Sequence, residues 1–172
     1  MYRLSQTILL RLPMLALTIG LLVIVGGIGC RSTKARSISI SIPVLPYLQS
    51  PMGKTSSIFP TLEIFNSRGE LIYLNHDGKG NAEVLKSLPQ SLGQLKSILG
   101  KPSLSEETEN LQGLTVEDRR TLLQSRLPTV VSIFLEECHS CSIQEQVVDD
   151  VGVSLTSKGI NSVVIYVMRS IA

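Results

Sequence analysis

The fold of this 172-residue chain is decided by residues 128–167, PTVVSIFLEECHSCSIQEQVVDDVGVSLTSKGINSVVIYV. Residues 129–135 are a run of β-branched and apolar side chains, which predicts a buried strand. Between Ile143 and Leu155, apolar residues recur at every fourth position with acidic residues between them, which predicts an amphipathic helix. A second apolar run at 160–168 predicts another strand. Because the connection is short and helical, we expect a right-handed crossover between parallel strands.

Two cysteines, Cys138 and Cys141, lie where the first predicted strand meets the helix. The unpaired N–H groups and the dipole at a helix start favour a thiolate. Their spacing places both sulfurs on the first turn, close enough to form a bridge. We therefore predict redox chemistry, with Cys138, nearer the helix start, as the attacking nucleophile and Cys141 as the residue that resolves the mixed disulfide.

The segment 128–167 resembles the strand, redox motif, long helix and next strand of the thioredoxin superfamily. The resemblance implies an α/β, thioredoxin-like fold and thiol–disulfide exchange with protein substrates. Glu136 and Glu137 stand where the family often has an aromatic residue, and their negative charge should disfavour a thiolate at Cys138. His139 either offsets this effect when protonated or is an exposed polar residue without a tuning role.

The second half of that family fold, a cis-proline loop, a β-hairpin and a final helix, does not follow residue 168. Upstream, Phe59-Pro60-Thr61 precedes LEIFNSRGELIYLNHDG, a predicted hairpin with its turn at 66–69, and a predicted helix from Asn81. This set resembles the missing half in permuted order, which would make Pro60 cis and pack it against the disulfide.

The same hairpin also resembles the N-terminal strand pair of membrane-tethered relatives that serve cytochrome c maturation or amine-dehydrogenase assembly. We favour this second arrangement. Under it the fold is incomplete, its terminal half is absent, and Pro60 only begins an edge strand.

The first 30 residues predict a membrane anchor or an export signal. No charged residue occurs between Leu12 and Cys30, a stretch long enough for a helix to cross a bilayer. The end of this stretch, Gly27-Ile28-Gly29-Cys30, resembles a lipoprotein processing site, which makes Cys30 a lipidation candidate. We favour a retained transmembrane helix, with the body on the extracytoplasmic, periplasmic side of a bacterial membrane.

The rest of the chain divides into a linker and a domain. Residues 31–57 contain three prolines and many small polar residues, which predicts a linker with one short extended stretch near 38–42. Residues 58–172 then form the thioredoxin-like domain. Within it, 101–114 is acidic and predicts a solvated loop without a function.

Composition excludes several other classes of protein. With 43% hydrophobic and 17% charged residues the chain is not disordered. Beyond residue 36 it carries 11 basic and 14 acidic side chains, and aromatic residues make up only 4%, so we expect no nucleic-acid partner.

We expect no cofactor and no metal, because structural zinc needs about four ligands. The only candidate ligands are Cys138, Cys141, His139 and the distant His76. Two alternatives to an enzyme stay open: Cu(I) binding by the two thiolates, and a non-catalytic assembly protein with an incomplete thioredoxin-like fold.

Overall fold

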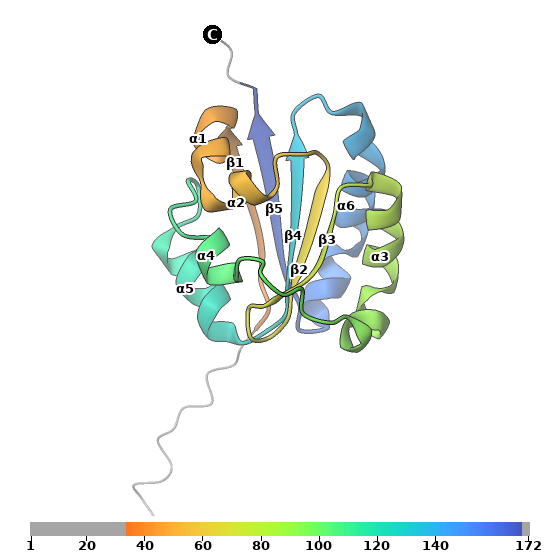
Figure 1. The fold of residues 1–172 in the computed structure, drawn as a ribbon. Coiled ribbons are helices and arrows are strands. Elements are labelled where there is room, and N and C mark those ends of the chain that lie inside the picture. Colours follow the sequence, from red (N-terminus) through yellow and green to blue (C-terminus); the bar gives the residue numbers. More distant parts are fainter. Residues whose placement is uncertain (1–33, 170–172) are drawn as a thin grey trace, which may run out of the picture. The chain divides into compact units, whose positions relative to one another are not determined.

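Five strands form one mixed sheet in the order β1-β5-β4-β2-β3. The computed structural model describes residues 34–169, and Figure 1 shows their arrangement. The strands are β1 (Ser37–Pro43), β2 (Thr61–Phe65), β3 (Leu71–Asn75), β4 (Thr129–Leu135) and β5 (Asn161–Met168). The helices are α1 (Val44–Gln49), α2 (Pro51–Thr55), α3 (Gly78–Ser91), α4 (Leu104–Glu107), α5 (Val116–Ser125) and α6 (Ser142–Ser157).

Strand direction changes once across the sheet. β1, β5 and β4 run parallel to one another, whereas β2 runs antiparallel to both β4 and β3. The unit β4-α6-β5 is the predicted crossover between neighbouring parallel strands, and this prediction is confirmed. The mixed α/β class is confirmed with it.

Helices cover both faces of the sheet, as the two-sided apolar character of β4 requires. Figure 1 shows α3 and α6 on one face and α1, α2, α4 and α5 on the other. Val131 and Ile133 belong to the core on the α1/α2/α4/α5 face, while Val130 and Phe134 belong to the core on the α3/α6 face. Alternate side chains of a strand point to opposite faces, so a strand buried on both sides must be apolar throughout.

The prediction that residues 31–57 form a linker is wrong for most of this segment. Residues 37–55 form β1, α1 and α2, and β1 pairs with β5 over its whole length. The side chains of Ile38, Ile40 and Ile42 point inward and the serines between them are exposed. This alternation is typical of an edge strand with one covered face, and the nearby prolines obscured it.

The favoured prediction that Pro60 only begins an edge strand is also wrong. The hairpin β2-β3 extends the sheet beyond β4, with its turn held by a hydrogen bond from the Gly69 N–H to the Asn66 carbonyl. Helix α3 follows the hairpin and packs beside α6. The Phe59–Pro60 peptide bond is cis, and Pro60 leads into β2, an inner strand and not an edge strand.

Two local predictions also differ from the structure. Helix α3 begins after Asp77, whose carboxylate accepts hydrogen bonds from the N–H groups of Lys79 and Gly80, and it continues past Pro89 to Ser91. The segment predicted as a solvated loop contains α4, and its Glu107 is fully buried. Tertiary packing decided the burial of Glu107, because sequence spacing cannot show which acid of this segment is buried.

None of the helices among residues 34–169 is long and apolar enough to cross a membrane. The predicted anchor over 1–30 and the lipidation candidate Cys30 lie outside the described residues. Both therefore stay predictions.

Candidate functional site

Cys138 and Cys141 form a disulfide at the end of β4. The chain leaves β4 through Glu136 and Glu137, and the left-handed backbone of Glu137, at φ 59°, turns it toward α6. The motif itself is a 3-10 turn over His139–Cys141, closed by a 3.0 Å hydrogen bond from the Cys141 N–H to the Cys138 carbonyl. Helix α6 begins only at Ser142, so Cys138 lies just before the helix and not on its first turn.

The two sulfur-bearing residues differ in their access to solvent. Cys141 is 1% exposed and lies in the core beneath α6, whereas Cys138 is half-buried at the surface. The Ser140 Oγ lies 3.2 Å from the Cys138 Sγ. Because a disulfide sulfur carries no hydrogen, the Ser140 hydroxyl is the donor in this contact. An attacking thiol can therefore reach Cys138 but not Cys141.

Pro60 is buried beside this motif. The first residue of α3, Gly78, lies between them: a Cβ at that position would be 2.8 Å from the Ser140 carbonyl oxygen and 3.2 Å from the Pro60 Cγ. Only glycine allows the start of α3 to approach the motif backbone this closely. Residues from three distant parts of the sequence thus meet at the motif backbone, and sequence reasoning did not identify Gly78.

A buried amide network holds the start of β2 against the helices. The Asn81 amide donates to the Gln144 Oε1 at 2.6 Å, and the Gln144 amide donates to the Thr61 carbonyl at 3.2 Å. The Thr61 hydroxyl lies 2.8 Å from His76 Nδ1, so His76, called distant in the sequence, lies close to the residue that follows Pro60. The sequence held a signal for Gln144, since it follows Cys141 by three residues and precedes Val148 by four, which is the spacing of one helix face.

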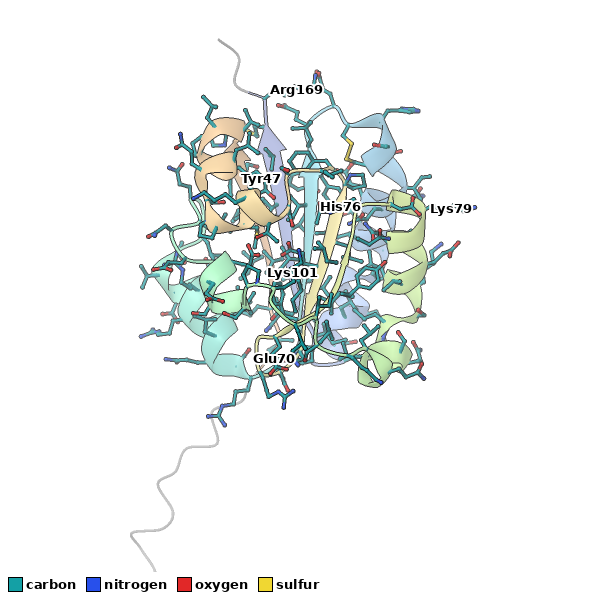
Figure 2. All side chains as sticks on the ribbon, in the orientation of Figure 1. Tyr47, Glu70, His76, Lys79, Lys101 and Arg169 are labelled. Carbon is teal, nitrogen blue, oxygen red and sulfur yellow. A yellow bond between two sulfur atoms is a disulfide. The ribbon has the colours of Figure 1, made fainter. Side chains whose placement is uncertain are left out.

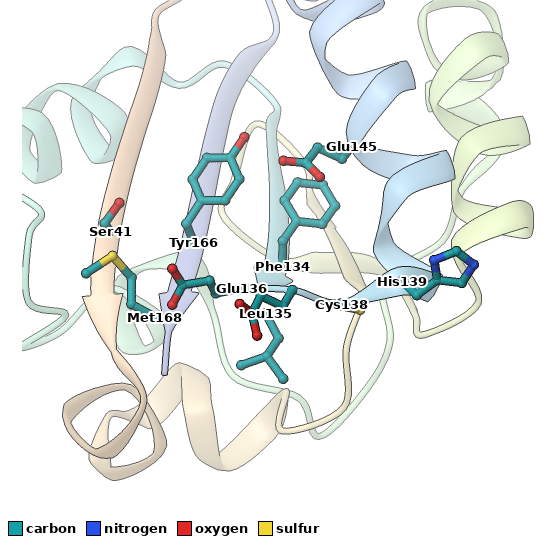
Figure 3. A pocket seen from close by; sticks show the side chains of 10 residues that line it. Ser41, Phe134, Leu135, Glu136, Cys138, His139, Glu145, Tyr166 and Met168 are labelled. Atoms are coloured by element: carbon teal, nitrogen blue, oxygen red, sulfur yellow. The ribbon is translucent and has the colours of Figure 1, made fainter. Parts of the chain in front are cut away.

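The ionisable residues in and next to the motif, Glu136, Glu137, His139 and Arg169, are exposed. Arg169 donates its N–H to the Glu136 carboxylate at 3.1 Å, and its guanidinium lies 3.8 Å from the Glu137 carboxylate. His139 is exposed, and Figure 3 shows its ring beyond Cys138, on the side away from Tyr166. Its tuning role stays a prediction.

A groove of about 600 Å³ opens next to Cys138. Its floor is a row of side chains on three adjacent strands: Phe134 of β4 is paired with Tyr166 of β5, which is paired with Ser41 of β1. The rings of Phe134 and Tyr166 lie 5.8 Å apart. Glu145 of α6 forms one side of the groove and Glu136 lies at its end, as Figure 3 shows. The groove exists because α6 leaves the small serines of β1 uncovered.

A second polar cluster lies in the core on the other face of the sheet. Glu63 of β2 is fully buried, and one of its carboxylate oxygens accepts a hydrogen bond from the Ser56 hydroxyl. Burial, together with the negative charge of the neighbouring Glu107, raises the pKa of Glu63 to about 8. The pKa of Glu107 is also raised, mainly by burial. The Tyr47 hydroxyl donates to the Ser56 carbonyl at 2.6 Å in the same cluster.

Among residues 34–169, no group of three or more His, Cys, Asp or Glu side chains is arranged to hold a metal ion. The absence of a cofactor stays a prediction. No protein-family model matches this chain, and no curated protein or solved structure gives a significant match.

Proposed function

We propose that this protein is a membrane-tethered, thioredoxin-like thiol–disulfide oxidoreductase that acts on protein substrates at the extracytoplasmic face of a bacterial membrane. One observation carries the proposal: the motif disulfide joins a half-buried Cys138 to a buried Cys141 at the start of a helix. A purely structural bridge needs no such difference in access. Stepwise exchange does, because one sulfur must meet the substrate first.

The order of the elements supports a permuted thioredoxin-like fold. In the family, the cis-proline, hairpin and final helix follow the strand, motif, helix and strand. Here a cis Pro60, the hairpin β2-β3 and helix α3 precede them in sequence yet lie beside them in space. The same set of elements thus surrounds the motif with the chain connected differently.

The positions of Cys138 and Cys141 define the order of steps by which a substrate disulfide is reduced. The Cys138 thiolate attacks one sulfur of a substrate disulfide, forming a mixed disulfide and releasing the other substrate sulfur as a thiolate, which takes a proton from water. Cys141 then loses its proton to solvent and attacks the Cys138 Sγ, which re-forms the Cys138–Cys141 bond and releases the second substrate thiol. The substrate gains two electrons and the motif loses them; an external dithiol returns the motif to its reduced form.

The oxidative direction uses the same atoms in reverse. A substrate thiolate attacks the Cys138 Sγ, and Cys141 leaves as a thiolate. A second substrate thiolate then displaces Cys138, and an external disulfide reoxidises the motif. Whether the protein mainly reduces or mainly oxidises its substrates depends on the reduction potential of the motif.

Exposed apolar side chains near the disulfide support a protein substrate. Five large apolar residues that are at least 39% exposed belong to segments that begin or end at the same end of the sheet as Cys138. They are Leu45 and Leu48 in α1, Ile58 before Pro60, Ile143 in α6 and Met168 at the end of β5. Such a rim suits contact with a macromolecule more than with a small thiol.

Trapping of mixed disulfides tests the function. In the native membrane, we expect Cys141→Ser in the full chain to accumulate mixed disulfides through Cys138, because the resolving thiol is gone. The measurement is non-reducing electrophoresis after acid quenching, with the trapped proteins identified by mass spectrometry.

The matched controls are Cys138→Ser and the double variant Cys138→Ser, Cys141→Ser, which separates trapping at the motif from any trapping at Cys30. A well-expressed Cys141→Ser variant with no species beyond those of the double variant contradicts the proposal. Stoichiometric Cu(I) uptake by the reduced protein without disulfide exchange would favour the copper-binding alternative, and normal function of the double variant would favour the assembly protein.

A further inference from the structure

The groove beside Cys138 has an aromatic floor and acidic sides. Phe134 and Tyr166 form the floor, while Glu136, Glu137 and Glu145 are the acidic residues that line it. Asp149 lies one turn after Glu145 on α6. Burial raises the pKa of the Tyr166 hydroxyl, and the nearby negative charges of Glu145 and Asp149 raise it further. The electrostatic potential at the floor of the groove is therefore negative.

Arg169 compensates only part of this negative potential. Its guanidinium lies 3.8 Å from the Glu137 carboxylate, and its backbone N–H donates a hydrogen bond to the Glu136 carboxylate. Glu145 has no ion pair within the described residues. The basic residue just before β1 lies at the opposite end of the sheet, where the Arg36 backbone N–H donates to the Asn161 Oδ1 and the Arg36 carbonyl accepts from the Ser162 N–H.

We propose, on the premise of the function proposed above, that this groove binds a basic segment of the substrate next to the reacting cysteine. The substrates are then proteins that are cationic around that cysteine. A lysine or arginine can lay its aliphatic stem on the part-exposed ring of Tyr166, which Phe134 supports from the core, and place its charge near Glu145. The length of the floor, from β4 across β5 to β1, suits an extended peptide that runs outward from the Cys138 sulfur.

The test compares peptides that differ only in flanking charge. Each probe is a pair of identical short peptides joined by one disulfide, with the cysteine flanked by lysine, glutamine or glutamate. The reduced full-length protein attacks the probe through Cys138, which breaks the peptide disulfide and releases one peptide as a thiolate. Cys141 then displaces the second peptide. Release of peptide thiol against time gives the second-order rate constant.

We expect the lysine probe to react about three- to tenfold faster than the glutamine probe at low ionic strength, with the two rates converging in high salt. Glu145→Gln should reduce this ratio, and the combination Glu136→Gln, Glu137→Gln, Glu145→Gln should bring it near one. The readout is the ratio of the lysine-probe rate to the glutamine-probe rate. Removing negative charge near Cys138 also alters its thiolate population, but that change affects all probes alike and cancels in the ratio. Glu109→Gln, an exposed acid outside the groove, is the control and should leave the ratio unchanged.

The outcomes separate this inference from the proposed function. Exchange with all probes at one rate, or fastest with the glutamate probe, overturns the basic-substrate inference and leaves the oxidoreductase standing. A lysine preference that survives the triple substitution also overturns it, because the charge would act elsewhere. No exchange with any probe, whether the reduced protein meets the peptide disulfide or the oxidised protein meets the peptide thiol, overturns the oxidoreductase itself.

Discussion

At the scale of single residues, environment decides what each titratable or reactive side chain does. Cys138 and Cys141 are three residues apart, yet one is half-buried at the surface and the other is 1% exposed. Glu106 and Glu107 are adjacent, yet Glu106 is exposed and caps α4 through Ser103, while Glu107 is fully buried. The residue type sets the chemistry that is available, and burial selects which part of it is used.

The pH dependence of stability tests the buried acid Glu63. Its pKa in the folded protein is raised from 4.5 to about 8, so the folded state keeps a proton that the unfolded state releases. Stability contributed by this group is complete below pH 4.5 and is lost as the pH rises to about 8. We expect the free energy of unfolding to fall by a few kcal/mol across this range. Urea denaturation at a series of pH values measures it.

Glu63→Gln should flatten that pH dependence and raise stability at the alkaline end, because a neutral amide can still accept the hydrogen bond from Ser56. Glu107 contributes in the same direction, so the double variant with Glu107→Gln should flatten it further. Glu109→Gln, in an exposed position, is the control. An unchanged slope in the double variant would contradict the assignment.

At the scale of elements, the position of the turn that carries Cys138 and Cys141 depends on the start of a helix that is more than 50 residues away in sequence. Helix α3 begins at Gly78, against the Ser140 carbonyl and the Pro60 ring. The amides of Asn81 and Gln144 then fasten α3, α6 and the first residue of β2 together. The position of the motif is thus fixed from outside the strand–helix unit that carries it.

Gly78→Ala tests this close approach. A methyl group there would meet the Ser140 carbonyl at 2.8 Å, so the motif and α3 must move apart. We expect a cost of about 1–3 kcal/mol in the free energy of unfolding. We also expect faster reduction of the Cys138–Cys141 disulfide by a small phosphine. Denaturant melts and stopped-flow reduction measure the two effects.

Gly152→Ala is the matched control, because nothing lies within 4 Å of a Cβ at that position on α6. It should stabilise the protein by about 0.5–1 kcal/mol through helix propensity and leave the reduction rate unchanged. Equal reduction rates for the two variants would show that Gly78 does not position the motif.

At the scale of the whole molecule, β1 and its following helices complete a core that the motif segment cannot close alone. Ile38, Ile40 and Ile42 are buried with Tyr47 and Met52 on the face opposite α6. Each such isoleucine contributes roughly 1.5–3 kcal/mol of burial, and a small domain has a net stability of only about 5–15 kcal/mol. Residues 37–55 are therefore part of the folding unit.

Truncation tests this boundary. A chain that starts at residue 34 should unfold cooperatively, because it keeps every described element. A chain that starts at residue 58 should lack a cooperative transition, because it loses β1, α1 and α2. Thermal melts followed by circular dichroism distinguish them. Ile42→Ala in the full chain should cost about 2–5 kcal/mol, with Ser39→Ala as an exposed control. A cooperative melt of the chain that starts at residue 58 would show that β1 is not part of the folding unit.

The sequence by itself determined the unit β4-α6-β5, the hairpin turn and the placement of two cysteines at a strand-to-helix junction. These features depend on residues close together in the chain, where periodicity, turn residues and spacing act directly. It also predicted a hairpin and a helix before the motif, but not their place in the sheet, because one hairpin pattern fits either side of a sheet.

Only the tertiary structure decided which strands are neighbours, that β1 is an edge strand of the core, that Glu107 is buried, and that Gly78 and Gln144 surround the motif. The groove beside Cys138 was likewise invisible in the sequence, since its floor joins residues from three strands. The physical reason is the same in each case: burial and close approach between distant segments depend on how all the elements pack together, and no local pattern encodes that packing.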